Sequence, residues 1–201
     1  MNNINLRTTG GKKEKVVTIF GSSKCLLGTE EYQTAYELGT LLARANYIIC
    51  NGGYGGVMEA SARGARNSGG KTIGVITEYF DRPANSFIDE VINAQSLIDR
   101  LLKLIELGDA YVILRGSTGT LVELATIWEY MNKSVMQSKP IIVVGNFWIP
   151  VIDTLKEELI HEGMENVTKF VMLANSPEEC VGVLAKKLKT GCNLMIRSPF
   201  K

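Results

Sequence analysis

The chain has 201 residues, of which 45% are apolar and 21% are charged, and its formal net charge is +1. This is the composition of an ordinary globular protein, and so small a charge gives no field that would attract nucleic acid or an anionic membrane surface. No apolar run approaches the roughly 20 residues that a membrane-spanning helix needs, and the polar stretch 1–15 lacks the apolar core of a signal peptide. We therefore expect a cytoplasmic protein with one domain over residues 15–190, a disordered N-terminal tail over 1–14 and a C-terminal tail over 191–201.

Apolar runs that resemble strands alternate along the chain with segments of helical periodicity. The first run, Val16–Phe20, is continuously apolar and ends at a small-residue turn, which is typical of a buried parallel strand. Thr29 is a suitable N-cap for the helix that follows, and Ser176 for the last helix. The predicted elements, in chain order, are a strand over 16–20, a helix over 29–46, a strand over 47–51, a helix over 56–67, a strand over 72–76, a short strand over 89–94, a helix over 96–107, a strand over 110–114, a helix over 120–132, a strand over 140–144, a helix over 150–161, a strand over 170–173 and a helix over 177–189.

This alternation of strands and helices predicts the fold class. It favours right-handed βαβ units and an α/β, Rossmann-like, doubly wound sheet that is mostly parallel, has about seven strands and carries helices on both faces. No linker or low-complexity block interrupts the pattern. In such a sheet, ligands bind at the carboxyl ends of the strands, so the turns that follow the strands are the places to search for a site.

Two of these turns are rich in glycine, and each leads from a strand into a helix. The first runs from Gly52 to Glu59 and the second from Arg115 to Glu123. A strand that turns on glycines into a helix presents backbone N–H groups and the positive end of the helix dipole to an anion. Neither turn has the G-x-G-x-x-G spacing of a dinucleotide site or the lysine of a P-loop. The pair predicts a phosphorylated small molecule held between the two turns.

A third small-residue turn, Gly21-Ser22-Ser23, follows the first strand, where doubly wound sheets bind nucleotides. Serine hydroxyls there can bond a phosphate or a ribose, although a strand-to-helix turn also needs small residues for structural reasons alone. We expect all three turns to contribute to one ligand site. The candidate ligand-binding and phosphate-binding residues are Gly21, Ser22, Ser23, Gly53, Gly55, Gly56, Met58, Gly116, Ser117, Thr118, Gly119 and Thr120.

The second glycine-rich turn contains Thr120-x-x-Glu123, for which the local sequence leaves two interpretations open. As a capping box, Thr120 is the helix N-cap and Glu123 folds back on the backbone. As a ligand site, the turn binds a phosphate and Glu123 faces the sugar. On the preceding helix, the local sequence favours a solvated surface position for Arg100, and Asp99 and Lys103 can pair with each other at i,i+4.

Trp128, Tyr130 and Met131 follow on the same predicted helix and make it unusually aromatic for a helix beside a polar site. Core packing is the default interpretation of these side chains. Two more specific alternatives are that they form a surface that stacks on a nucleotide base, or that they form a subunit interface.

The thiols and the single histidine do not indicate a metal centre. Cys25, Cys50, Cys180 and Cys192 are scattered without Cys-x-x-Cys spacing, and His161 is the only histidine. We expect reduced cysteines used as small apolar side chains, with no metal and no cofactor.

Taken together, these motifs resemble those of the Lonely Guy (LOG) family over Val16–Leu159. The first strand of that family ends in Gly-Ser, as it does here at Gly21. Its Gly-Gly-x-x-Gly-Leu-Met turn is matched by the segment from Gly52 to Met58, and its hallmark Pro-Gly-Gly-x-Gly-Thr-x-x-Glu is matched in part by the segment from Arg115 to Glu123. The family also has an arginine nine residues before a strand-opening Asp-Ala, which matches Arg100.

The resemblance implies an activity and an assembly. LOG enzymes hydrolyse the N-glycosidic bond of a nucleoside 5′-monophosphate, which gives the free base and ribose 5-phosphate, and the matching positions make Glu123 and Arg100 the catalytic residues. The family is homodimeric, with the helix after the hallmark motif near the interface, so Trp128 and Met131 become interface candidates. The expected partners are a nucleotide-like small molecule and a second copy of the chain.

Two departures from the pattern indicate a side branch of the family. Arg115-Gly116-Ser117 replaces Pro-Gly-Gly, and Leu101 replaces the lysine that follows the arginine. Molybdenum-cofactor carrier proteins are similar too, since they share the first glycine-rich turn and bind without catalysis. The alternative function is therefore a non-catalytic binding or carrier protein for a nucleotide or a molybdenum-cofactor-like ligand. A structural protein with no nucleotide site is a third, weaker alternative.

Overall fold

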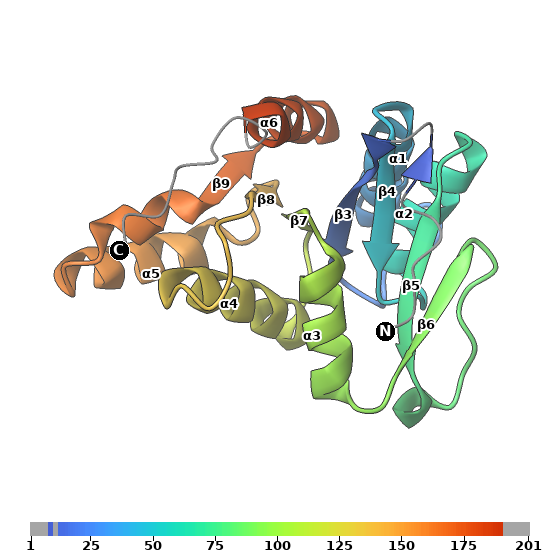
Figure 1. The fold of residues 1–201 in the computed structure, drawn as a ribbon, viewed down its shortest axis with the longest axis horizontal. Coiled ribbons are helices and arrows are strands. Elements are labelled where there is room, and N and C mark those ends of the chain that lie inside the picture. The colour runs from blue at the N-terminus through green and yellow to red at the C-terminus, as the bar shows by residue number, and fades with distance from the viewer. Residues whose placement is uncertain (1–7, 10–11, 191–201) are drawn as a thin grey trace, which may run out of the picture.

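The fold is a parallel sheet with helices on both of its faces, as Figure 1 shows. The computed structural model describes residues 8–9 and 12–190. Its main sheet has seven strands in the order β6-β5-β4-β3-β7-β8-β9, and every neighbouring pair is parallel. The expected Rossmann-like α/β architecture is confirmed.

The strands of this sheet are β3 (Lys15–Phe20), β4 (Tyr47–Asn51), β5 (Thr72–Thr77), β6 (Glu90–Ala94), β7 (Ala110–Ile113), β8 (Ile141–Val144) and β9 (Val171–Ala174). The helices are α1 (Glu30–Arg44), α2 (Val57–Asn67), α3 (Leu97–Leu107), α4 (Thr118–Asn132), α5 (Ile149–His161) and α6 (Pro177–Thr190), with short 3-10 turns η2 (Glu78–Phe80) and η3 (Glu165–Phe170).

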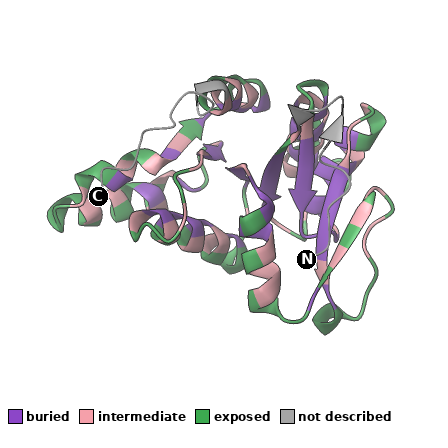
Figure 2. Ribbon diagram, viewed as in Figure 1, coloured by how far each residue is buried: buried purple, intermediate pink, exposed green. Residues whose placement is uncertain are grey.

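Alternate residues of each strand supply two separate apolar layers. In β3, Val16 and Phe20 join a cluster with side chains of α3, α4 and α5, whereas Val17 and Ile19 join a cluster with side chains of α1, α2 and α6. This period of two follows from the pleat of a strand, and because both faces are covered, the strand sequence is apolar throughout. Figure 2 shows the resulting buried central strands, with exposed residues on the outer faces of the helices.

The direction of the chain reverses at β3, which positions the site. From β3 the chain adds β4, β5 and β6 on one side and then returns to add β7 on the other side. The connections after β3 and β7 therefore leave the same edge of the sheet in opposite directions, and this is the crevice in which doubly wound folds bind ligands.

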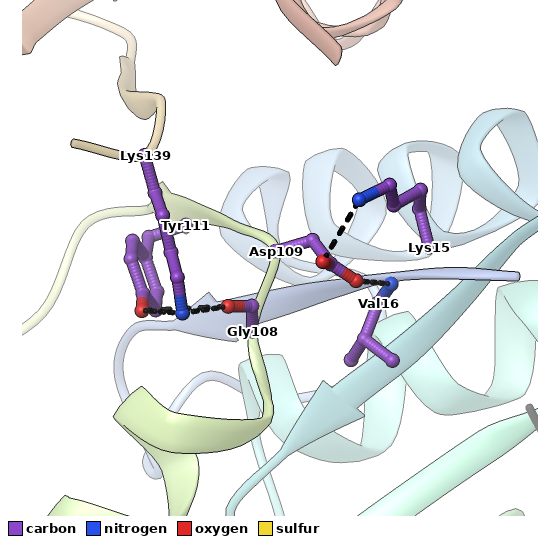
Figure 3. Close-up of polar contacts among 6 residues, drawn as sticks. All are labelled: Lys15, Val16, Gly108, Asp109, Tyr111 and Lys139. Carbon is purple, nitrogen blue, oxygen red and sulfur yellow. Dashed lines mark hydrogen bonds and ion pairs between the residues drawn. The ribbon is translucent and has the colours of Figure 1, made fainter. Parts of the chain in front are cut away.

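Polar contacts at the opposite, amino edge fix β7 beside β3 (Figure 3). The Asp109 carboxylate accepts a hydrogen bond from the Val16 backbone N–H at 2.9 Å and pairs with the Lys15 ammonium group at 3.1 Å. Lys139 donates to the Gly108 carbonyl at 2.6 Å and to the Tyr111 hydroxyl at 3.3 Å. The strand-opening Asp of the sequence motif thus has a structural role, because it sets the β3–β7 register.

Helices α1 and α2 approach each other closely through glycine. A Cβ atom added at Gly64 would lie 2.0 Å from the Tyr36 carbonyl oxygen, and one added at Gly39 would lie 2.0 Å from the Ser61 carbonyl oxygen. The small residues of α2 therefore serve contact with α1 as well as with the sheet, since helix backbones come this close only where side chains are missing.

We expect Gly64→Ala to lower the free energy of unfolding by about 1–3 kcal/mol, because the extra methyl group would force the two helices apart. Gly182→Ala in α6 is the matched control, since its added Cβ would meet no atom within 4 Å, and removing a helical glycine there should stabilise by about 0.5–1 kcal/mol. Urea denaturation of both variants tests the pair, and equal stabilities would contradict the close-packing argument.

Element boundaries agree with the sequence prediction to within about two residues, and the N-cap at Thr29 is confirmed by its side chain, which accepts from the Tyr32 N–H at 3.3 Å. Part of the segment expected to be disordered is paired instead: β1 (Thr8–Thr9) and β2 (Lys12–Lys13) form an antiparallel ladder, which needs only backbone groups. The rest of the predicted tails, 1–7, 10–11 and 191–201, lies outside the described residues. None of the helices in the described part of the chain is both long and apolar enough to cross a membrane.

Candidate nucleotide-binding site

The three turns singled out in the sequence meet at the carboxyl edge of the sheet and are joined by backbone hydrogen bonds. The Ser22 N–H donates to the Arg115 carbonyl at 2.9 Å, and the Val57 N–H donates to the Ser22 carbonyl at 2.8 Å. Gly56, with φ of 68°, allows this approach, because a Cβ there would lie 2.3 Å from the Ser22 oxygen. The glycines thus let three turns pack into one rigid unit.

A cavity of about 510 Å³ opens between these turns, α3 and the loop after β5. Eight of the predicted site residues line it, and Ser22, Gly53, Gly55, Gly56, Gly116 and Thr118 do not. The predicted residues that line it are Gly21, Ser23, Met58, Arg100, Ser117, Gly119, Thr120 and Glu123. The cavity is the place where one molecule can contact all three turns.

The first glycine-rich turn is largely occupied by contacts with the protein itself. The Gly53 N–H donates to the Asn51 side chain at 2.8 Å, and the Gly53 carbonyl accepts from the backbone and side chain of Asn85. Only Tyr54 and Met58 reach the cavity from this turn. The turn therefore supplies the cavity with side chains, and its amides mainly hold neighbouring segments in place.

The second turn has the free amides. Helix α4 begins at Thr118, two residues earlier than predicted, and its N-cap residue Ser117 makes no side-chain capping bond. The first N–H groups of a helix have no partner within the helix, so those of Thr118, Gly119 and Thr120 remain available to an anion. A capping box pairs the N-cap residue with a glutamate three residues later. With Ser117 as the N-cap, that later position is Thr120, and Glu123 lies three residues farther along the helix, so the capping-box interpretation is excluded.

The carboxyl group of Glu123 faces the cavity from α4. It is only partly exposed, through the cavity. Burial raises the pKa of Glu123 to about 8, and the positive charge of Arg100 opposes this shift without cancelling it. A carboxyl group that titrates close to neutral pH is suited to chemistry in which a charge develops or a proton moves.

The Arg100 side chain is fixed by carbonyl groups of the neighbouring strands. Its Nε donates to the Val75 carbonyl at 2.7 Å and its Nη2 to the Gly52 carbonyl at 2.9 Å. Burial lowers the pKa of Arg100, and the nearby Glu123 opposes this change. Among the described residues no acceptor is assigned to Nη1, so its N–H groups can serve a ligand. The surface position that the local sequence favours is therefore wrong, whereas the site role that the family motif implies for Arg100 stays a prediction.

We expect Gly52→Ala to lower activity or ligand affinity by roughly 10- to 100-fold, the range for one charge-assisted contact, with little loss of thermal stability. A Cβ at Gly52 would lie 1.7 Å from Arg100 Nη2, so the guanidinium group would have to leave its carbonyl partner. Ligand affinity and thermal melting of the variant are the measurements. An unchanged affinity would show that Arg100 does not depend on this glycine.

Four cavity residues were not predicted as site residues: Lys24, Tyr54, Phe80 and Arg82. Tyr54 lies inside a predicted turn, so its position was within reach of sequence reasoning. Phe80 and Arg82 come from the segment between β5 and β6, which the sequence presents only as a loop. No local signal indicates that this loop folds back over the site.

The structure confirms the default interpretation of the aromatic segment of α4, which is core packing. Trp128 and Met131 are almost fully buried, and the Trp128 indole N–H donates to the Val167 carbonyl at 3.0 Å, so they pack in the core and line neither the cavity nor an interface. The Arg115 side chain points away from the cavity, pairs with Glu31 at 3.2 Å and lies over the Phe147 ring. It therefore neither blocks the cavity nor lines it.

Comparisons with known proteins bear on this geometry. The model of a family described as the SLOG cluster4 family matches residues 14–181. An uncharacterized protein of Archaeoglobus fulgidus is 30% identical over 129 residues, which are 64% of this chain and 83% of that protein. A cytokinin riboside 5′-monophosphate phosphoribohydrolase of Rhodococcoides fascians is 27% identical over 154 residues, which are 73% of this chain and 76% of that protein. Among solved structures, the molybdenum cofactor binding protein of Rippkaea orientalis matches with a TM-score of 0.70 at 24% identity, over 88% of this chain and 98% of that chain, which shows a shared fold.

Proposed function

This chain belongs to the SLOG cluster4 family, a LOG-like family, and from that premise we propose that it hydrolyses the N-glycosidic bond of a nucleoside 5′-monophosphate. The membership confirms the resemblance that the sequence motifs carry. Relatives named as phosphoribohydrolases, at 27–33% identity, support a nucleotide phosphoribohydrolase. The observation that carries the proposal is the placement of Glu123 and Arg100 in one cavity with the uncapped start of α4.

The 5′-phosphate binds at the start of α4. The backbone N–H groups of Gly119 and Thr120, which line the cavity, donate to its oxygens, and the helix dipole favours its charge. The hydroxyl group of Ser117, another cavity residue, lies at the same helix end and adds a donor. Gly119 leaves open space at this point, since a Cβ added there would meet nothing within 4 Å. The phosphate therefore fixes the nucleotide by its end, with the ribose directed along α4.

The ribose then lies beside Glu123, which is the catalytic carboxylate. As the N-glycosidic bond breaks, the ribosyl carbon develops oxocarbenium character, and a carboxylate close to it stabilises that positive charge. The same carboxylate orients the water that attacks the carbon and accepts the proton that this water loses, and the proton ends on the nitrogen of the released base. The low-polarity surroundings that raise the pKa of Glu123 also strengthen its interaction with the developing charge.

Arg100 assists the leaving base. Bond cleavage leaves an electron pair on the base nitrogen, and a guanidinium group that is always protonated can neutralise this charge or hold the base in position. Its anchoring to two carbonyl groups fixes the direction of Nη1, so the donor is in place before the substrate arrives. Organised positive charge of this kind is the larger part of many catalytic effects.

A panel of nucleoside monophosphates tests the proposal. Purified protein is incubated with AMP, GMP, CMP and UMP, and free base and ribose 5-phosphate are measured by chromatography. Release of base from at least one nucleotide is the expected result. Binding of a nucleotide without release of base would overturn catalysis and favour the carrier alternative, which the shared fold of molybdenum-cofactor binding proteins supports. Absence of any nucleotide-dependent rise in melting temperature would overturn both.

The homodimer stays a prediction, with different residues from those that the sequence indicated. Since Trp128 and Met131 are buried, the apolar side chains available for an interface are others, such as Ile98 and Leu102 of α3 and Val122 of α4, all of which are exposed. Light scattering of the purified protein tests the assembly, and a monomer at all concentrations would refute it.

A further inference from the structure

The loop between β5 and β6 forms one end of the cavity and is held firmly against the first glycine-rich turn. Asn85 donates from its side chain to the carbonyls of Gly53 and Tyr54, at 3.1 and 2.8 Å, and from its backbone N–H to Gly53 at 2.8 Å. The Tyr54 hydroxyl in turn donates to the Thr77 carbonyl at 3.0 Å and accepts from the Thr77 N–H at 2.9 Å. These bonds keep the loop, and Arg82 on it, at the mouth of the cavity.

The aromatic surface at this end is already covered by cations. The Arg82 guanidinium lies 4.3 Å from the centre of the Tyr54 ring and 5.4 Å from that of Phe80. The Arg100 guanidinium lies 5.5 Å from the Tyr54 ring centre. A ligand that reaches this end therefore meets positive charge and not a free apolar wall on which to stack.

The cavity lining carries an excess of positive charge. It contains Lys24, Arg82 and Arg100 against the single carboxyl group of Glu123. Within the described ranges, 8–9 and 12–190, neither Lys24 nor Arg82 takes part in an ion pair, and the acidic neighbours of Arg82 on its own loop do not pair with it. One phosphate at the start of α4 leaves the positive charge at the opposite end without a partner.

The order of the groups along the cavity assigns that end to the base. Glu123 lies about one turn along α4 from the phosphate-binding amides, its charge acts on Arg100, and Arg100 and Arg82 both contact the Tyr54 ring. With the phosphate at the helix start and the ribosyl carbon at Glu123, the base extends towards Arg82.

We infer that the substrate is a nucleoside 5′-monophosphate whose base carries a carboxylate group, and that Arg82 binds this carboxylate. The inference rests on the proposed function, because the phosphate position sets the direction of the nucleotide. The planar guanidinium group matches a carboxylate with two parallel hydrogen bonds. An apolar substituent on the base would instead desolvate Arg82 without supplying a partner, which is unfavourable.

The test compares three nucleotides that differ at one position of the base: N6-succinyl-AMP, AMP and N6-isopentenyl-AMP. We expect the wild-type protein to have its highest kcat/KM with the succinyl compound. Arg82→Gln should lower kcat/KM for the succinyl compound by roughly 10- to 100-fold, mostly through KM, because one charge-assisted contact is lost. The same variant should change kcat/KM for AMP by less than about 3-fold. Arg82→Lys should restore part of the loss. Arg63→Gln is the matched control, since Arg63 also lies over an aromatic ring, 5.6 Å from that of Phe87, but does not line the cavity.

The outcomes separate this inference from the function on which it rests. Equal losses for all three nucleotides in Arg82→Gln would mean that Arg82 only holds Tyr54 in place, and a wild-type preference for the isopentenyl compound would mean that this end is apolar. Either result overturns the inference and leaves the hydrolase intact. Hydrolysis of none of the three nucleotides by the wild-type protein, together with a negative monophosphate panel, overturns the proposed function and the inference with it.

Discussion

Replacing Glu123 with glutamine is expected to lower the rate of nucleoside monophosphate hydrolysis by at least roughly 100-fold, the low end for a catalytic carboxylate. Glutamine has almost the same shape, so the cavity and the phosphate-binding amides of α4 stay intact. What is lost is the negative charge that stabilises the oxocarbenium-like transition state and orients water. Nucleotide binding, measured by calorimetry, should remain within about tenfold of wild type, so the loss appears in kcat.

Glu129→Gln provides the control for this prediction. Glu129 lies on the same helix, but it is exposed and pairs with Lys133 at 3.7 Å on the surface. Its replacement should change neither rate nor affinity, because exposed ion pairs contribute little. An unchanged turnover in Glu123→Gln would remove Glu123 from the mechanism and leave the cavity as a binding site.

The pH dependence of kcat/KM is the second large effect. Because the pKa of Glu123 is raised to about 8 and the ionised form is the catalytic one, kcat/KM should rise by about tenfold from about pH 7 to about pH 9 and then level off. Arg100, Arg82 and Lys24 are the cations that line the same cavity. The window also avoids the ionisation of the substrate phosphate near about pH 6. A rate that falls as pH rises would instead assign Glu123 the role of a protonated acid.

Ionisation of Glu123 should raise kcat/KM but lower the free energy of unfolding. The pH dependence of stability is therefore an independent measurement of the same pKa. The folded protein holds a proton on Glu123 up to about pH 8, whereas an unfolded chain releases it near the ordinary value of 4.5. The folded state therefore binds more protons between these values, and stability falls as pH rises through this window. Glu123→Gln removes the cost of a buried charge, so above about pH 8 it should be the more stable protein, by roughly 1–3 kcal/mol.

Most of the fold could be predicted from the sequence because each strand has a clear local signal. Val16–Phe20 is apolar throughout and is bounded by polar and small residues, and the later strands follow the same rule. The start of α4 was misjudged because Thr120-x-x-Glu123 has the form of a capping box. The backbone turns into the helix two residues earlier, after Ser117, where the chain must leave β7 and pass beside Gly21.

The site could be predicted only where a turn or a motif carries it. The glycine-rich turns predict the edge of the sheet at which the cavity lies, and the family motif selects Arg100, which lines that cavity, against the local pattern. Arg82 was missed because its position depends on Asn85, which ties the loop to the first turn from 32 residues along the chain. Contacts of this kind depend on the folded backbone, and a single sequence does not show them.

The interlocked glycine turns and the β5–β6 loop differ in how freely they can evolve. The turns are fixed by their backbones: any side chain introduced at Gly56 would collide with Ser22, so substitutions there disrupt folding before they can alter specificity. The loop brings exposed side chains to the cavity, such as Phe80 and Arg82, which can be exchanged at little cost to the core. Engineering a new substrate preference into this protein should therefore begin with a library at the β5–β6 loop, where diversity is tolerated, and leave the turns untouched.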